Sequence, residues 1–344
     1  MFRRYNIAAT ALMVALPAAV AFTTSTAPAS AETFNYDPGD NVFFTYCYSH
    51  PVALRIKPGD TVVTSTRDAS NEVYTTSDKT IFPKLDLTAV NPQTGPFYIE
   101  GAEPGDTLVV HIDKISLNRD WGWGGSIPGF GTLAPEYKTA MITDPVPDLL
   151  YIWRLDRDRM VGTLDLPKSK IGSIEVPLRP FLGTIGTALG GKECWSSLTP
   201  GPHGANMDFN EVIEGVTMHF PVFEPGALLM LGDGHAAQGD GEVGGAAIET
   251  SFDVTFTVDL IKGKSIGWPR LITDDVIMTI GSTRPMIDAI RLACVSMVNW
   301  LVDDYGYDKL EAVQLLGQTA AIEIANAVDP QYSVACILDK KYLP

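Results

Sequence analysis

Short apolar runs with a polar residue at every second position recur between residues 32 and 280. Examples are "TLVVHIDKISL" (107–117) and "FDVTFTVDLI" (252–261), whose alternation has the period of a half-buried β-strand. Gly, Pro, Asp and Asn residues separate the runs, as the turns between strands require. The pattern predicts many short strands, and therefore a β-sandwich core, over residues 32–280.

Two segments share one turn pattern, "KPGDTVV" at 57–63 and "EPGDTLVV" at 103–110. Pro-Gly makes a tight turn, and Asp-Thr leads into the strand that follows. We interpret both segments as structural turns that begin strands, because two copies are too few for a repeat architecture.

The C-terminal part of the chain changes to helical spacing. Apolar and small residues recur at helical positions over 283–304. Asp308 and Glu311 form a D-x-x-E start signal for a second helix, which is expected to run towards Ala327. The segment "YSVACIL" at 332–338 is typical of a final strand.

The C-terminal segment, residues 281–344, is therefore expected to place a helical pair on one side of the β structure. The whole chain is predicted to be mostly β, in the α+β class. Of its 344 residues 45% are hydrophobic and 19% are charged, which is enough apolar material for one large core or two modest ones.

The first 31 residues have the composition of a secretory signal. Arg3 and Arg4 precede an apolar run over 7–22, and "APASA" at 27–31 supplies the small residues of a cleavage site. The alternative is an uncleaved anchor, but the run is short for the roughly 20 apolar residues of a spanning helix. We expect residues 1–31 to be removed and the mature protein to be periplasmic or extracellular, without membrane contact.

The acidic balance of the chain excludes two classes of partner. The formal net charge is −16 at pH 7. A field of this sign repels the phosphate backbone of nucleic acids and anionic membrane surfaces. A small neutral or cationic substrate suits the chain better.

Four cysteines, Cys47, Cys194, Cys294 and Cys336, are widely spaced, and no C-x-x-C motif occurs. In an oxidising compartment they allow three complete disulfide pairings. Two interpretations stay open: buried free thiols, or one bridge, for which Cys294 with Cys336 is the candidate. The spacing does not support a structural zinc site.

The densest polar cluster is "LGDGHAAQGDGE" at 231–242, where acids, a histidine and a glutamine alternate with glycines. Glycine lets the backbone approach a ligand closely, and the polar side chains offer oxygen and nitrogen donors. A solvated surface turn is the alternative. Because the flanking segments are apolar or small, we expect the loop to lie between buried strands and to have a functional role.

A second cluster, "TPGPHGANMDFNEV" at 199–212, contains His203, Asn206 and Asp208. Amide hydrolysis needs an electrophile for the carbonyl oxygen, a base for water and an acid for the departing nitrogen, and these residue types supply them. Taken alone, the segment is also a good turn sequence. Asp68 and Glu100 each end a predicted strand, where a buried carboxylate needs a partner.

The signatures of a covalent nucleophile are weak. The sequence has no G-x-S-x-G motif, and "GGSIPG" at 124–129 has the wrong spacing. Lys192, Glu193 and Cys194 are neighbours, whereas a Cys-Glu-Lys triad assembles from distant segments. His111 and His219 lie in segments with the alternating pattern of strands, and we interpret both as structural residues. Attack by water is favoured, with a covalent amidase through Cys194 as the rival enzyme.

At these clusters the chain resembles the acetamidase/formamidase family. The matching segments are "NPQTGPFYIEGAEPGDTLVVHI" (91–112), "IEVPLRPFLGTIGTA" (174–188), "PGPHGANMDFNEVIEGVTMHFPV" (200–222) and "GALLMLGDGHAAQGDGEVGGAAIE" (226–249). The resemblance implies short aliphatic amides as substrates, a carboxylate and ammonia as products, a β-sandwich core, a homo-oligomer and a divalent metal. The leader and the aromatic stretch "NRDWGWGGSIPGF" (118–130) depart from the family pattern and could favour a larger or aromatic amide.

The resulting hypothesis is hydrolysis by water activated at a divalent ion, zinc or calcium. The candidate metal ligands are Asp233, His235, Asp208, His203 and Asp68. The candidate catalytic residues are Glu242, Asp240, Asn206, Gln238 and Glu100, and Glu249 also lies in a family-like segment. Glu242 or Asp240 would be the base, and Asn206 or Gln238 would hold the oxyanion. The alternative from another class is an exported protein that binds a small ligand or metal without turnover.

Overall fold

The computed structural model describes residues 31–82, 84–133 and 146–344. Contacts join Ala31–Pro344 into one compact unit. The predicted signal sequence lies outside the described residues, apart from its last position. No helix in the described ranges is long and apolar enough to cross a membrane.

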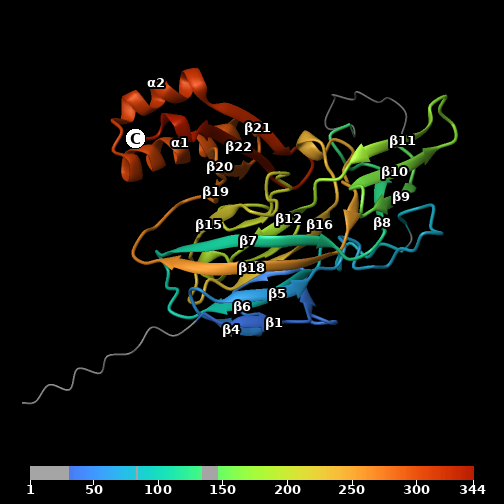
Figure 1. The fold of residues 1–344 in the computed structure, drawn as a ribbon, viewed down its shortest axis with the longest axis horizontal. Helices are drawn as coiled ribbons and strands as arrows, with labels where there is room; N and C mark the ends of the chain where they lie inside the picture. The colour runs from blue at the N-terminus through green and yellow to red at the C-terminus, as the bar shows by residue number, and fades with distance from the viewer. Residues whose placement is uncertain (1–30, 83, 134–145) are drawn as a thin grey trace, which may run out of the picture. The chain divides into compact units, whose positions relative to one another are not determined.

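Within the described residues, one sheet has nine strands, of which β7 (Thr107–Leu117) and β18 (Phe252–Ile261) cross the middle of Figure 1. Its spatial order is β1 (Thr33–Asn35), β5 (Thr61–Ser65), β18, β7, β15 (Thr217–Pro221), β19 (Arg270–Ile272), β20 (Val276–Thr283), β22 (Tyr332–Asp339) and β21 (Ala321–Asn326). The two long alternating segments expected from the sequence, β7 and β18, are antiparallel neighbours at its centre. Every pairing in this sheet except β1 with β5 is antiparallel.

The other large sheet has eleven strands in the same part of the chain. Its main path is β11 (Gly172–Pro177), β10 (Val161–Leu166), β9 (Leu149–Asp156), β8 (Trp121–Ser126), β17 (Glu249–Thr250), β16 (Leu229–His235), β12 (Phe181–Gly186) and β14 (Gly204–Asn206). Strand β6 (Gln93–Ile99) also pairs with β16, and β2 (Val42–Phe43) and β4 (Leu54–Ile56) pair in turn with β6. A separate two-stranded sheet joins β3 (Thr45–Cys47) and β13 (Cys194–Ser196).

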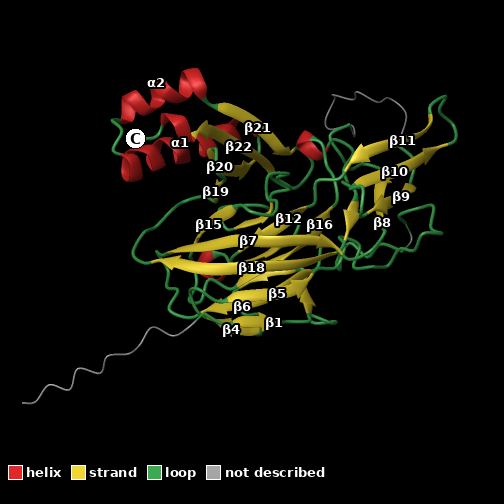
Figure 2. Cartoon of the chain, viewed as in Figure 1, coloured by secondary structure: helices red, strands yellow, loops and turns green. Residues whose placement is uncertain are grey.

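Apolar side chains from both large sheets form one continuous core. Leu108 and Phe256 come from the nine-stranded sheet, and Leu182 and Leu231 come from the eleven-stranded sheet; all four are fully buried. Two sheets that share a core in this way form a sandwich. The mostly β fold with a C-terminal helical pair is therefore confirmed (Figure 2).

The two Pro-Gly-Asp segments are turns that begin strands, as expected. In each, the aspartate carboxylate accepts the backbone N–H three residues earlier: Asp60 from Lys57 at 2.7 Å, and Asp106 from Glu103 at 2.8 Å. Gly59 precedes Asp60 with a φ of +93°, a left-handed conformation that glycine adopts without steric cost. The strands β5 and β7 begin directly after the two aspartates.

Helices α1 (Met286–Tyr305) and α2 (Lys309–Thr319) lie beside β20 and β22 in Figure 1. The Asp308 carboxylate accepts the N–H groups of Leu310 and Glu311, so the expected helix start is confirmed. The expected run towards Ala327 is wrong, because α2 ends at Thr319 and the next residues form β21. Those residues pair with β22 at the edge of the sheet, a long-range contact that helical spacing does not reveal.

The cysteines pair differently from the candidate bridge. Cys47 and Cys194 are directly opposite each other in β3 and β13 and form a disulfide. Cys294 and Cys336 are free thiols, on α1 and β22, so the pairing suggested from sequence is wrong. The bonded state of Cys194 also removes the thiolate that a covalent amidase would need.

Candidate active site

A buried group of carboxylates surrounds one histidine at the end of β16. Asp233 and His235 are two residues apart on that strand, so their side chains lie on the same face. His235 is paired in register with Glu249 of β17. The His235 Nε2 atom lies 3.3 Å from Asp233 Oδ1 and 3.2 Å from Glu249 Oε2. Asp208, which follows β14, and Glu242 complete the cluster, and all five residues are buried.

The ligand atoms of this cluster converge as a cation site requires. Two overlapping groups, Asp208–Asp233–His235 and His235–Glu242–Glu249, each have one ligand atom per residue within 4.8 Å of the others. Asp208 Oδ1 is buried and has no hydrogen-bond partner among the described residues, and Asp233 Oδ1 and Glu249 Oε2 face no donor there other than His235 Nε2. Buried carboxylate oxygens with so few donors are costly, so the residues present fit a bound divalent cation.

Gly183 on β12 keeps the space beneath these atoms open. A Cβ atom built on it would lie 2.7 Å from Asp208 Oδ1, 2.7 Å from Asp233 Oδ2 and 2.8 Å from His235 Cε1. Any larger residue would therefore push into the converging ligand atoms, and the site needs glycine at this position for space.

Gln238 fixes the proton position on His235. Its Nε2 group donates to the backbone oxygens of Asp208 at 2.8 Å and Ala325 at 3.2 Å, so its Oε1 atom is the side that faces His235 Nδ1, at 2.9 Å. Nδ1 must then carry a proton and donate it. The other ring nitrogen, Nε2, faces the carboxylate oxygens, an arrangement that suits an imidazolium or a neutral ring that binds a cation.

An amide and carboxyl network supports Asp208 from behind. Asn326 Nδ2 donates to Asp208 Oδ2 at 2.6 Å, and Asn206 Nδ2 donates to the same oxygen at 2.9 Å. Asn206 Nδ2 also donates to Asp329 Oδ2, and its Oδ1 accepts from Asn91 Nδ2, both at 2.5 Å. The Asn206 and Gln238 amides are thus committed to protein partners, and the expectation that either holds the oxyanion is wrong.

Three carboxylate residues of the cluster have left-handed backbone conformations. The φ angles are +45° at Asp208, +58° at Asp233 and +50° at Glu242. Residues other than glycine adopt this region at a cost of order 1 kcal/mol or more, and such residues concentrate at functional sites. The fold therefore holds these three residues in a backbone conformation that their side chains disfavour.

The charges of the cluster are poorly compensated. Burial raises the pKa of Asp208 well above its usual range, and the charge of Glu242 raises it further. Burial also raises the pKa of Glu242 strongly and the pKa of Asp329 to about 6. Burial lowers the pKa of His235, but the neighbouring carboxylates, Glu249 foremost, outweigh it, and the pKa lies well above its usual value. A cation here would offset the mutual repulsion of the acids.

The cluster forms the floor of a cavity of about 340 Å³. All of the carboxylates named above and His235 line it, and no lysine or arginine does so within the described residues. Its other lining residues are mainly apolar, and they include Phe82, Trp123 and Phe130. The cavity therefore combines an acidic floor with a wall that can bury an apolar group.

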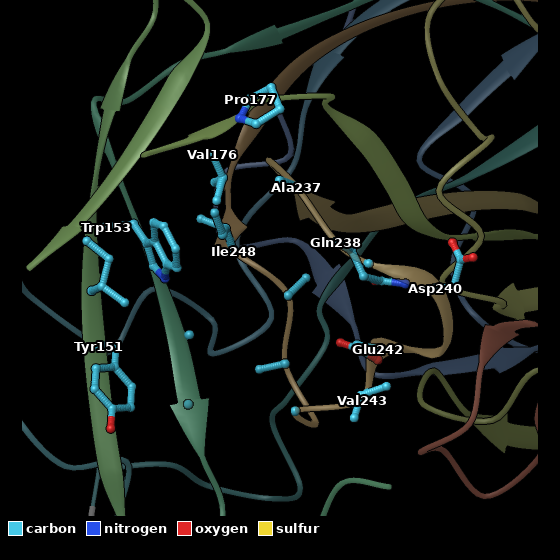
Figure 3. A pocket seen from close by; sticks show the side chains of 17 residues that line it. Tyr151, Trp153, Val176, Pro177, Ala237, Gln238, Asp240, Glu242, Val243 and Ile248 are labelled. Carbon is cyan, nitrogen blue, oxygen red and sulfur yellow. The ribbon is translucent and has the colours of Figure 1, made fainter. Parts of the chain in front are cut away.

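A second hollow, of about 570 Å³, lies on the other side of the segment that carries Glu242. Figure 3 shows Tyr151 and Trp153 on one side of it and Gln238, Asp240 and Glu242 on the other. Among its lining residues only Glu242 and Ala246 also line the acidic cavity. Most of the converging ligand atoms lie in the acidic cavity, which is therefore the candidate active site.

Not all of the expected site residues meet in this cavity. Asp240 is exposed and accepts from Asn210 Nδ2 at 3.2 Å, and Glu100 is exposed at the end of β6. The expectation that Glu100 is buried is therefore wrong, and both Glu100 and Asp240 lie outside the cluster. Glu100 lies in the turn after β6, and Asp240 begins a short 3-10 helix, Asp240–Glu242.

Two of the expected metal ligands have other surroundings. His203 is fully buried, with its ring centroid 5.2 Å from that of Tyr46 and 5.8 Å from that of Trp195, and burial lowers its pKa to about 3. Asp68 is paired with Arg119 at 2.7 Å. Neither belongs to the two groups of converging ligand atoms, so the structure gives neither a place in the cation site.

Sequence reasoning also missed residues that complete the site. Asn91 precedes β6, Gly183 lies on β12, and Asn326 and Asp329 lie at the end of β21 and in the loop after it. Asn91 and Gly183 belong to segments that resemble the family, and this resemblance could have marked them as site residues. Asn326 and Asp329 lie in a segment that the sequence pattern predicts to be the end of a helix. The sequence offers no local signal for their place in the site.

The fold and the cavity together define a class of protein. It is a β-sandwich protein with a buried acid and histidine cluster at the floor of a cavity. Comparison with known proteins narrows this class.

A model of the Acetamidase/Formamidase family matches residues 45–191 and 191–338. The chain therefore belongs to this family, and it is a hydrolase that acts on the C–N bond of linear amides. It is 26% identical to an acetamidase from Mycolicibacterium smegmatis, over 80% of this chain and 85% of the relative. A formamidase from Methylophilus methylotrophus is also 26% identical, over 81% and 83% respectively.

Solved structures agree with this assignment. The acetamidase from Yersinia enterocolitica superposes with a TM-score of 0.84 at 34% identity, covering 92% of this chain and 94% of that one. A predicted acetamidase/formamidase from Thermoanaerobacter tengcongensis has a TM-score of 0.80 at 29% identity, covering 91% and 97%.

Proposed function

We propose that the chain hydrolyses a small linear primary amide, of which formamide and acetamide are the shortest members, to a carboxylate and ammonia. Water adds its oxygen to the acyl carbon, the C–N bond breaks, and the departing nitrogen takes up a proton. The observation that carries the proposal is the convergence of Asp208, Asp233, His235 and Glu249 on one floor of a substrate-sized cavity.

We infer that this floor holds a divalent cation. Asp208, Asp233 and Glu249 would bind it through the carboxylate oxygens that converge near His235, and His235 through Nε2. An imidazole nitrogen among the ligands favours zinc over calcium, which prefers oxygen alone. Such an ion supplies Lewis acidity and lowers the pKa of a bound water molecule to about 7.

Glu242 is the residue best suited to move the proton. It is buried beside the cluster, and burial raises its pKa well above that of a free carboxyl group. A base of this kind accepts the proton of the attacking water and then donates it to the departing nitrogen. His235 is held by Gln238 and cannot turn to take this role.

We further propose that the protein works outside the cytoplasm. Two features support this: the signal-like residues 1–31, and the Cys47–Cys194 disulfide, which is typical of oxidising compartments. The mass of the protein recovered from culture is expected to correspond to a chain that begins at Glu32. Recovery of the full-length chain from the cytoplasm alone would contradict export.

An ammonia-release assay on acetamide and propionamide tests the proposed function. Glu242→Gln is expected to lower kcat at least about 100-fold, the size of a general acid–base contribution, with the fold intact by circular dichroism. The variant retains the shape of the side chain and loses its basicity. A protein that binds amides without releasing ammonia would be the non-catalytic alternative and would contradict the proposal.

Chelation tests the cation separately. Removal of bound metal is expected to abolish ammonia release, and zinc is expected to restore it. Metal content, measured by mass spectrometry of the purified protein, is expected to fall in Asp233→Asn. Full activity in the metal-free protein would leave a mechanism that depends on carboxylates alone.

A further inference from the structure

Beside its acidic floor, the cavity has a wall of large apolar side chains. Phe82, Leu85 and Val90 come from one segment, and Trp123, Ile127 and Phe130 come from another. Trp123 is 4% exposed and packs edge-on against Tyr74, so part of the wall is fixed by its own small core. A rigid apolar surface beside a reaction centre is a binding surface for an apolar group of the substrate.

We propose that this wall selects a primary amide with a neutral, ring-sized acyl group, aryl or arylalkyl, over formamide and acetamide. The proposal rests on the amide hydrolysis proposed above and names its substrate class. The first argument is size. The cavity of about 340 Å³ lies in the range of roughly 300–1,000 Å³ that holds drug-sized ligands. Acetamide, with one methyl group, would leave the aromatic wall uncovered.

The second argument is that the acidic floor and the apolar wall of the cavity come from different parts of the sequence. The acidic floor comes mainly from the segments that resemble the family, 200–222 and 226–249. The apolar wall comes mainly from residues 69–90 and 123–130, which lie outside those segments although the family model spans them. The chemistry and the acyl-group surface are thus carried by different parts of the chain.

The third argument is charge. The floor carries Asp208, Asp233, Glu242, Glu249 and Asp329, and no cationic side chain lines the cavity within the described residues. The wall carries no charged donor, and its unpaired polar group among the described residues is the neutral indole N–H of Trp123. An acyl group with a negative charge would be repelled and would lose its hydration, so the acyl group is expected to be neutral.

Rates of ammonia release from acetamide, isobutyramide and phenylacetamide test the proposal. We expect kcat/KM for phenylacetamide to exceed that for acetamide at least 10-fold, because each buried methylene is worth about 0.8 kcal/mol. A phenylacetamide that carries a ring carboxylate is expected to be at least 10-fold poorer than phenylacetamide itself. Equal or higher kcat/KM for acetamide would overturn the substrate class and leave amide hydrolysis standing. Hydrolysis of none of the amides would overturn both.

A matched pair of variants locates the effect. Phe130→Ala is expected to lower the ratio of kcat/KM for phenylacetamide to that for acetamide about 10-fold. Phe223→Ala removes another half-buried ring, which contacts Gly190 and lines neither hollow, and is expected to leave the ratio unchanged. Leu85→Ala, from the other wall segment, provides a second test. An unchanged ratio in both wall variants would overturn the proposal.

Discussion

The site depends on Gly183 having no side chain. Its Cβ position lies 2.7 Å from Asp208 Oδ1 and from Asp233 Oδ2, so an alanine must displace one of these carboxylates. Because a shift of about 1 Å in a reacting group can cost about 100-fold in rate, Gly183→Ala is expected to lower kcat/KM by about that factor. Gly267→Ala is the control, since its Cβ would meet nothing within 4 Å. An active Gly183→Ala would contradict the placement of these carboxylates.

Gln238 acts through His235 and is a positioning residue. Replacement by leucine removes the acceptor of the His235 Nδ1 proton, and the ring is then free to turn away from Asp233 and Glu249. We expect Gln238→Leu to weaken binding of zinc about 10- to 100-fold, the usual effect of losing the partner of a ligating histidine. Competition with a fluorescent chelator measures this affinity. Gln314→Leu, on the exposed face of α2, is expected to leave it unchanged.

At the scale of elements, the Pro-Gly-Asp turn before β7 is a stabilising feature that can be tested apart from the site. The buried Asp106 carboxylate accepts from the backbone N–H groups of Glu103 and Gly263 and from Lys262 Nζ. Loss of these charged hydrogen bonds in Asp106→Ala is expected to lower the free energy of unfolding by about 2 kcal/mol. Urea denaturation measures the change, and Asp274→Ala at an exposed position is the control.

The same turn predicts a dependence on pH. Burial raises the pKa of Asp106, but the hydrogen bonds from Lys262, Gly263 and Glu103 outweigh it and hold the pKa below its usual value. The contribution of Asp106 to the free energy of unfolding is therefore complete above the unfolded pKa of about 3.9. It is lost as the pH falls through the lower pKa of the folded state. The difference in stability between the wild type and Asp106→Ala is expected to shrink below about pH 4. A difference that stays constant down to pH 2 would contradict this.

The elements also show what could be predicted from sequence. The period of two in β7 and β18 and the Asp308 start of α2 are local signals, and the structure confirms them. Strand β21 follows α2 directly, and it forms only because β22 offers an edge for pairing. Asn326 and Asp329 reach Asp208 through that long-range pairing. Periodicity contains no information about such contacts, so this part of the site could not be predicted.

At the scale of the whole molecule, the Cys47–Cys194 disulfide closes a loop with a sequence separation of 147 residues. A cross-link over such a length restricts the unfolded chain, and its removal in the Cys47→Ser, Cys194→Ser double variant is expected to cost about 2–4 kcal/mol. Thermal unfolding with and without reductant measures the effect. Reductant is expected to lower the Tm of the wild type only, and an equal response of both proteins would contradict a structural role for this bond.

The central claim is that the buried acid and histidine cluster, and not the exposed acids beside it, hydrolyses the amide. The most direct measurement is the initial rate of ammonia release by Asp233→Asn and Asp240→Asn, since these aspartates lie seven positions apart in one segment. The account predicts that Asp233→Asn loses at least about 100-fold in rate, as expected for loss of a metal ligand or catalytic charge. Asp240→Asn should remain within a few fold of the wild type. Full activity in Asp233→Asn, or loss of activity in Asp240→Asn alone, would contradict it.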